Sequence, residues 1–179
     1  MVAYSYGMLM SDRMPALKMT SPSAPQPAEP DVLSSRPGFL IRRMHQIHLA
    51  LFAEECAGFN ITPVQYSIMT VIGAQPKLDQ ARLAYEVGVD RATLANVLAR
   101  LETKGFVKRT TCKNDKRLKL ASLSASGVTM LERMRLAVQR AHERTIASLP
   151  KADRAIFLSL LMRLVDAENE YGRAPLRLD

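Results

Sequence analysis

The sequence predicts a mainly α-helical fold that carries one small β-hairpin. From residue 37 onward, apolar residues recur every three or four positions through most segments, as amphipathic helices require. Two strand-like runs, residues 106–111 and 118–123, flank a short charged loop. Between Val87 and Gly127 the order is therefore helix, strand, basic hairpin, strand, helix. That order is typical of a winged helix-turn-helix, in which the hairpin forms the wing.

Composition allows one globular unit with a basic surface. The chain has 179 residues, is 47% apolar and carries a formal net charge of +8, so it can bury one core, or one core plus a subunit interface. The charge suits a polyanionic partner, although DNA, RNA and an anionic membrane surface fit it equally well. No apolar run reaches the roughly 18 residues that span a bilayer, and no secretion signal stands at the N-terminus. We expect a cytoplasmic protein.

Residues 1–35 are predicted to be a disordered tail. Five of the ten prolines fall there, interleaved with serine, alanine and glutamine, and such a segment is too polar and too often interrupted to form a core. An over-extended start site would produce the same composition.

Two helices are expected next. Residues 37–57 carry an apolar stripe at helical spacing, and Gly58 marks its end. Residues 62–65 read Thr-Pro-Val-Gln, which supplies an N-cap, a proline in the first turn and a capping-box glutamine for a helix that runs to Gly73.

A helix-turn-helix follows. Residues 78–87 are predicted to form a short third helix, and Gly88 lies where a left-handed turn would end it. Asp90 can cap a fourth helix that ends near Gly105. Its inward stripe is Leu94, Val97, Leu98 and Leu101.

The opposite face of this fourth helix suits DNA recognition. Small residues allow the backbone to approach a groove, while arginine, threonine and asparagine can contact phosphates and base edges. The residues we expect to contact DNA from this helix are Arg91, Thr93, Ala95, Asn96 and Arg100. The alternative interpretation is an ordinary solvated polar face.

The hairpin loop gives this face its context. Lys113, Lys116 and Arg117 project at the tip, and residues 77–119 hold eleven basic and five acidic side chains. Such a tip can enter a minor groove, where arginine responds to groove width and negative potential. Asp115 fits this role if it orients the Arg117 guanidinium or braces the loop. A charged, solubilising turn is the alternative.

Two long helices close the chain, at residues 124–148 and 151–171. The last carries a broad apolar stripe, wider than a small winged domain needs, formed by Ile156, Phe157, Leu160, Leu161, Leu164 and Val165. This stripe favours a subunit interface.

Residues 101–109 and 115–127 together resemble the exit of the recognition helix and the wing signature of the MarR family. The resemblance covers about residues 36–172. It implies a homodimer built from residues 36–62 and 124–172, with a DNA-binding lobe at residues 63–123, and it makes Arg117 the arginine of the minor groove with Asp115 as its partner. A two-fold dimer would place two recognition helices about one DNA turn apart, on a pseudo-palindromic operator.

The resemblance also implies a small, often aromatic, anionic effector in a cleft between the dimer helices and the DNA-binding lobe. Residues on the first two helices that could form the apolar wall and polar anchors of such a cleft are Arg42, His45, His48, Phe52 and Tyr66. The stretch from Gly38 to Ile72 further resembles repressors of aromatic and nicotinate-type acid catabolism. The histidines are equally compatible with a surface or interface role. His45, His48 and His142 lack the carboxylate or cysteine that would complete a metal site, so no metal or other cofactor is expected.

The sequence thus predicts a ligand-responsive repressor. Motifs of hydrolases, zinc proteases and nucleotide-binding enzymes are missing, so catalysis is not expected. Two other functions stay open, namely an effector-independent architectural DNA-binding protein and a thiol-based redox regulator. For the latter, Cys56 has no evident activating partner in the sequence and Cys112 lies beside the wing, so we expect two reduced thiols.

Overall fold

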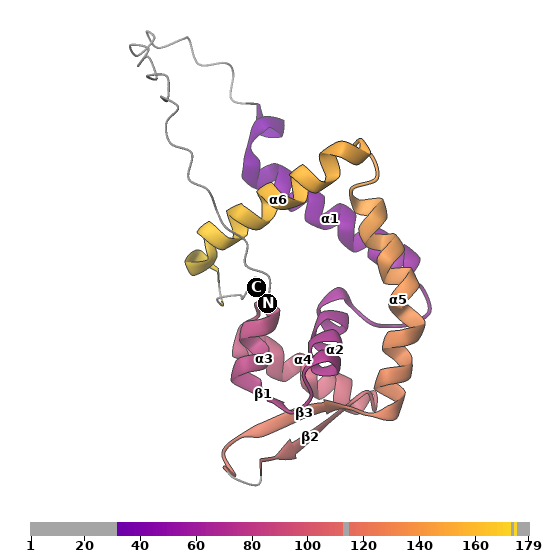
Figure 1. Cartoon of the computed structure of the whole chain (residues 1–179), viewed down its shortest axis with the longest axis vertical. Helices are drawn as coiled ribbons and strands as arrows, with labels where there is room; N and C mark the ends of the chain where they lie inside the picture. The colour runs from indigo at the N-terminus through magenta and orange to yellow at the C-terminus, as the bar shows by residue number, and fades with distance from the viewer. Residues whose placement is uncertain (1–31, 113–114, 173, 175–179) are drawn as a thin grey trace, which may run out of the picture.

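The computed structural model describes residues 32–112, 115–172 and 174. Figure 1 shows a lower lobe of short helices on a small sheet, a long helix that rises from this lobe, and further long helices that lie above it. The elements in chain order are η1 (Leu33–Ser35), α1 (Pro37–Glu55), α2 (Pro63–Ala74), β1 (Leu78–Asp79), α3 (Gln80–Val87), α4 (Arg91–Thr103), β2 (Val107–Thr111), β3 (Lys119–Leu123), α5 (Ala125–Thr145), α6 (Lys151–Ala167) and η2 (Asn169–Tyr171).

The predicted tail lies almost wholly outside the described residues. Leu33–Ser35 nevertheless form a 3₁₀ turn, just ahead of residue 36, where we expected the folded region to begin. The two terminal helices are slightly shorter than predicted. The α5 helix ends at Thr145, and α6 ends at Ala167 before the separate 3₁₀ turn at Asn169–Tyr171.

The lower lobe is the predicted winged helix-turn-helix. Helices α2, α3 and α4 lie above an antiparallel sheet with strand order β1-β3-β2. Its interior consists of aliphatic and methionine side chains that are almost completely buried, including Ile68, Met69, Leu83, Leu94, Leu98 and Leu101. Burial of one such side chain contributes about 1.5–3 kcal/mol, so this shared core holds the three helices and the sheet together.

The prediction that a helix starts at Leu78 is wrong. Leu78 and Asp79 form the edge strand β1, where Leu78 pairs with Ala121 and Asp79 with Leu120. Helix α3 begins at Gln80 because the Asp79 carboxylate accepts a hydrogen bond from the Arg82 N–H at 2.9 Å and so caps the first turn. A two-residue strand has no periodicity of its own, and its partner lies more than forty residues further along the chain.

Helix starts follow the capping signals. Thr62 Oγ1 accepts from the Gln65 N–H at 3.3 Å, and Gln65 Oε1 accepts from the Thr62 N–H at 3.1 Å, which completes the predicted capping box of α2. Ser124 Oγ accepts from the Gly127 N–H at 3.0 Å at the start of α5. These local bonds determine where each helix begins, and hence where the wing joins the long helix.

Gly127 permits a close approach between α5 and the start of β2. A Cβ at this position would lie 2.1 Å from the backbone oxygen of Phe106, which already accepts the Ser124 N–H at 3.0 Å. We expect Gly127→Ala to lower the free energy of unfolding by about 2 kcal/mol or more, because backbone must shift to relieve the contact. Chemical denaturation measures this. The matched control is Gly38→Ala, whose Cβ would meet nothing within 4 Å; equal stability of the two variants would contradict the prediction.

The long helices α1 and α5 pack along each other. Phe52 from α1 and Cys56, the C-cap of α1, lie in the same buried cluster as Met134 and Val138 from α5. Ion pairs line the seam, where Arg140 Nε lies 2.7 Å from Glu55 and Arg144 lies 2.9 Å from Glu54. The lower lobe is thereby tied to α1 through α5, so a shift of α1 against α5 would move that lobe.

Helices α1 and α6 carry large apolar side chains that a single subunit leaves in solvent. No residue of α6 is buried. Exposed aliphatic residues on the two helices include Leu40, Ile41, Ile47, Ile156, Leu160 and Leu164. Among the described residues, no helix combines the length and apolar character needed to cross a bilayer.

Candidate nucleic-acid interface and effector site

The start of α4 is held by a tight turn and a strong cap. Gly88 adopts the left-handed conformation (φ 68°) that ends α3, as predicted. The Asp90 carboxylate accepts hydrogen bonds from the Thr93 N–H at 2.8 Å and the Thr93 hydroxyl at 2.7 Å. These two bonds lower the pKa of Asp90, so the cap is charged and the position of α4 relative to α3 is well defined.

The faces of α4 divide as the sequence predicts. The inward stripe is buried, while Arg91, Asn96 and Arg100 are exposed and Thr93 and Ala95 are half-buried. The hydroxyl proton of Thr93 is used by Asp90, so Thr93 could offer DNA only its lone pairs. Arg91, Asn96 and Arg100 are therefore the donors that this helix exposes most freely.

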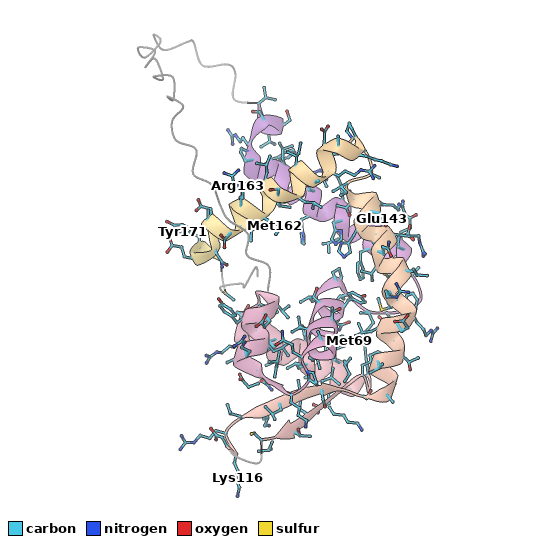
Figure 2. All side chains as sticks on the ribbon, viewed as in Figure 1. Met69, Lys116, Glu143, Met162, Arg163 and Tyr171 are labelled. Atoms are coloured by element: carbon cyan, nitrogen blue, oxygen red, sulfur yellow. The ribbon has the colours of Figure 1, made fainter. Side chains whose placement is uncertain are left out.

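The wing is a two-stranded ribbon with a basic tip. Val107 pairs with Leu123 and Thr111 with Lys119. Lys116 and Arg117 are exposed, and the Lys116 side chain points away from the body of the molecule (Figure 2). Lys113, which we also expected at the tip, lies outside the described residues.

Asp115 contacts the wing backbone. Its Oδ1 accepts from the Arg117 N–H at 2.9 Å, and its carbonyl oxygen accepts from the Leu118 N–H at 3.0 Å. Of the two roles that the sequence allowed, bracing the loop is therefore the one with a contact in the structure. Within the described part of the chain, the Arg117 guanidinium has no ion-pair partner and remains available to a ligand.

Arg109 does not add to the basic tip. Its Nε lies 2.8 Å from Glu102 Oε2, and a second nitrogen of the same guanidinium contacts the same oxygen. This pairing lowers the pKa of Glu102. The bond ties the end of α4 to β2 and neutralises one of the cations that the sequence places near the wing, so the surface presented to DNA is less basic than a residue count suggests.

The five residues proposed for the effector occupy different environments. Phe52 is 3% exposed and belongs to the core, and Tyr66 packs half-buried against the same core. Arg42 and His45 are exposed on α1, where the Arg42 guanidinium lies 5.3 Å from the centre of the Phe39 ring. His48 is half-buried, with its ring centroid 6.3 Å from that of Phe52.

His48 also joins α1 to α5. Its ring stacks on His142 with centroids 5.1 Å apart, and its Nδ1 lies 2.9 Å from Thr145 Oγ1. Thr145 donates its own proton to the Ala141 carbonyl oxygen, so His48 Nδ1 is the donor and neutral His48 keeps Nε2 as an acceptor. The sequence suggested His142 only as a metal ligand; its stacking on His48 comes from helix packing.

Acidification should therefore destabilise this contact. Burial lowers the pKa of His48, and His142 and His45 lower it further by repelling the protonated form. A lowered pKa in the folded state means that the contribution to stability is present above about pH 6.5, the unfolded value, and is lost as pH falls below it. We expect the free energy of unfolding to decline on this acid limb, as thermal denaturation at several pH values would record.

The control for this pH dependence is His48→Gln. A glutamine can still donate to Thr145 but does not titrate, so its stability should vary less between pH 7.5 and 5.5. An identical decline in the variant and the unaltered protein would show that other groups cause it.

The structure gives no support to a reactive Cys56. This thiol is buried, and burial raises its pKa, with the neighbouring Glu55 carboxylate adding to the rise. A thiolate is the reactive form, so the local environment disfavours oxidation. Across the residues that the structure describes, no three histidine, cysteine or acidic side chains converge as metal ligands do.

Comparison with known proteins places this geometry in a family. The MarR family model matches residues 61–119, which is the lobe that holds α4 and most of the wing. The putative transcriptional regulatory protein for the hcr operon of Thauera aromatica is 33% identical over 74% of this chain and 81% of its own length. The HTH-type transcriptional repressor NicR of Pseudomonas putida is 26% identical over 87% of this chain and 98% of its own.

A solved structure extends the similarity to the long helices. The PcaV transcriptional regulator from Streptomyces coelicolor, in complex with its natural ligand, is 30% identical and superposes with a TM-score of 0.73. The alignment covers 78% of this chain and 99% of that one. The match therefore includes the helices that carry the exposed apolar faces.

Proposed function

Since this chain belongs to the MarR family, we propose that it represses transcription as a homodimer and that a small aromatic acid releases it from its operator. Membership makes it a DNA-binding transcriptional regulator, in keeping with relatives that are regulators rather than enzymes. The observation that carries the proposal is the exposed polar face of α4 beside a basic wing tip. Arg91, Thr93, Ala95 and Asn96 would meet the major groove, with Arg100 contacting DNA from the same helix. Lys116 and Arg117 would meet the minor groove, with Asp115 bracing the loop.

Dimerisation is supported by the apolar surfaces. Residues 36–62 and 124–172 would form the dimerisation region, and residues 63–123 the DNA-binding lobe. Leu160 and Leu164 are 50% and 60% exposed in one subunit, and exposed patches of this kind mark interfaces. Two copies related by a two-fold axis would present two α4 helices to a pseudo-palindromic operator.

The effector would bind where α1 meets the lobe. Arg42, His45 and His48 share one face of α1 and supply the donors that a carboxylate needs, while Phe52 and Tyr66 form part of the apolar wall behind them. The PcaV structure, which holds its natural ligand, supports a ligand site in a protein of this shape.

Release follows from a shift between two conformations. In one conformation of the dimer the two lobes are spaced to fit the operator, and in the other they are not. An effector that binds the second conformation more tightly shifts the population towards it, and operator occupancy falls. The packing of α1 on α5 provides the connection, because α5 leads directly from the wing to the dimer helices.

The test is fluorescence anisotropy on DNA from the intergenic region upstream of the coding sequence, titrated with a panel of aromatic carboxylates. Selective binding that one acid weakens is the expected result. Selective binding that no acid alters would overturn the effector assignment and keep the regulator. Weak binding without sequence preference would favour an architectural DNA-binding protein, the second candidate, which the net charge of +8 favours.

A further inference from the structure

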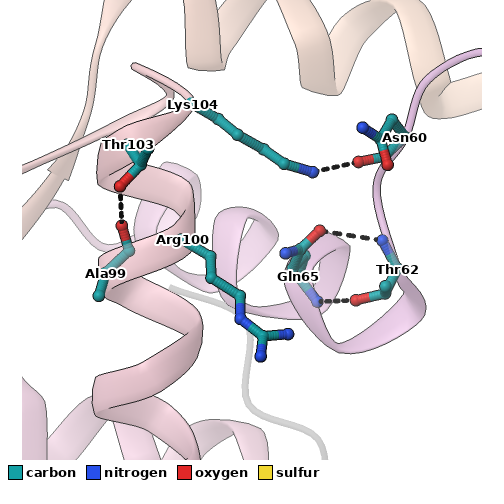
Figure 3. Close-up of a pocket in the computed structure, with 7 residues that line it drawn as sticks. All are labelled: Asn60, Thr62, Gln65, Ala99, Arg100, Thr103 and Lys104. Carbon is teal, nitrogen blue, oxygen red and sulfur yellow. Dashed lines mark hydrogen bonds between the residues drawn. The ribbon is translucent and has the colours of Figure 1, made fainter.

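A hollow of about 450 Å³ lies between the N-terminus of α2 and the C-terminal half of α4 (Figure 3). Asn60, Thr62 and Gln65 form the α2 side, and Arg100, Thr103 and Lys104 form the α4 side. Apart from Arg100, none of these residues was expected to form a site from the sequence. A ligand that fits this hollow would therefore supply hydrogen-bond acceptors.

The hollow is positively charged. Two cations line it and no carboxylate does. The Lys104 ammonium donates to the backbone oxygen of Asn60. The Arg100 side chain reaches from α4 towards α2 (Figure 3), and no carboxylate among the described residues pairs with it. The positive end of the α2 dipole points to the same space.

The Gln65 side chain supplies an amide donor that has no acceptor among the described residues. The residue is only 5% exposed. Its Oε1 is used in the capping box, whereas its Nε2 has no hydrogen-bond partner in the described chain and lies on the side of the amide that faces α4 (Figure 3). Because no fully buried side-chain polar atom of the described residues lacks a hydrogen-bond partner, this Nε2 is open to the hollow, where an anion could accept its hydrogen bond.

The position of the hollow relates it to DNA. Ala92, Asn96, Arg100 and Thr103 follow one another at helical spacing along the exposed face of α4. Arg100 lies one turn beyond Asn96, or about 6 Å along the helix axis. The major groove is about 12 Å wide, so its edge lies about 6 Å from its middle. With Asn96 near the middle of the groove, Arg100 and the hollow would meet the sugar-phosphate backbone.

We propose that this hollow is a phosphate seat, in which the Arg100 guanidinium and the Gln65 amide bind one backbone phosphate of the operator while Lys104 adds charge. The proposal rests on the proposed DNA-binding function and adds a contact that is independent of base sequence. Such a contact sets the position of α4 on the duplex without reading it.

The test uses Gln65→Glu. A glutamate keeps an acceptor oxygen for the Thr62 N–H, so the capping box and the melting temperature should be retained, but it replaces the free amide donor with a carboxylate that repels phosphate. We expect operator and non-operator DNA to bind about tenfold more weakly, by the same factor for both. Gln46→Glu is the matched control, with the same charge change on α1 beside Arg43, and should stay within about twofold.

A chemically altered duplex locates the phosphate. Methylphosphonate substitution, which removes one phosphate charge at a time, should weaken the unaltered protein at one flanking position per half-site and should have no effect there on Gln65→Glu. The slope of affinity against salt should fall by about one counterion in Arg100→Gln.

The outcomes separate this seat from the proposed function. Unchanged DNA affinity in Gln65→Glu would overturn the seat and leave the regulator intact. If inorganic phosphate weakened DNA binding more than chloride of equal ionic strength, and only with Gln65 present, while no methylphosphonate position mattered, the hollow would bind a free anion and the DNA contact would be overturned. Failure of the unaltered protein to bind any DNA would overturn both.

Discussion

Replacing both Arg117 and Asn96 with alanine is expected to weaken operator binding by at least about thirtyfold. Each removed contact to a groove typically costs about 1–3 kcal/mol, and the two side chains lie on different elements, so their losses should add. Arg117 is available because Asp115 contacts its backbone N–H, at 2.9 Å, and leaves the guanidinium free. Asn96 is exposed on α4 and can form paired hydrogen bonds with adenine.

The two single variants should affect DNA binding in different ways. Arg117→Ala should lower affinity and reduce the dependence on A·T content beside the core site, whereas Asn96→Ala should relax selectivity within it. Anisotropy at one fixed salt concentration, on operator and scrambled duplexes, measures both quantities. Arg135→Ala is the control, since Arg135 is 60% exposed on α5 and, among the residues that the structure describes, pairs with Glu132 alone. Retained affinity in the double variant would contradict these assignments.

Most of the lobe could be predicted because its signals are local. The proline and glutamine after Thr62 specify the start of α2, and Gly88 with Asp90 specifies the turn into α4. Each signal acts within four residues, so the sequence around it contains the needed information. The buried stripe of α4 is also a local pattern, and every member is buried in the structure.

Contacts between distant segments could not be predicted in the same way. Strand β1 exists only because β3 offers it a partner, and Arg109 is neutralised by a glutamate seven residues away across the junction of helix and strand. The stacking of His48 on His142 depends on how two long helices pack. None of these contacts leaves a periodicity or a motif in the sequence. Counting charges and assigning helix faces therefore could not predict which side chains contact each other.

The candidate site was likewise predictable where its signals are local, and was missed where they depend on packing. The sequence identified the exposed face of α4 and the wing tip, because exposure there follows from the buried stripe on the other side. It missed the hollow beside Gln65, because the capping box accounts for only one end of that amide. A glutamine that caps a helix and is also 95% buried would have been the signal, and burial is a property of the assembled lobe.

Replacing Leu160 and Leu164 with aspartate should convert the dimer to a monomer and abolish selective operator binding. Both side chains are exposed on α6 in one subunit, so the change leaves the subunit's own core untouched. If they are buried between subunits, each loses about 2 kcal/mol of apolar burial and adds a charge that has no partner there. The dimer affinity should then fall at least a thousandfold. Light scattering at micromolar concentration measures the mass, and thermal denaturation checks that the chain still folds.

Ser159→Asp is the matched control for this change. Ser159 is exposed on the same helix, but it points away from the face that carries Leu160 and Leu164, so the added charge should leave the dimer intact. A monomer binds one half-site through a single α4 and wing, and loses the gain in affinity that comes from linking two half-sites. Its residual affinity should therefore resemble that for non-operator DNA. A double aspartate variant that stayed dimeric and bound its operator normally would place the subunit interface elsewhere than on α6.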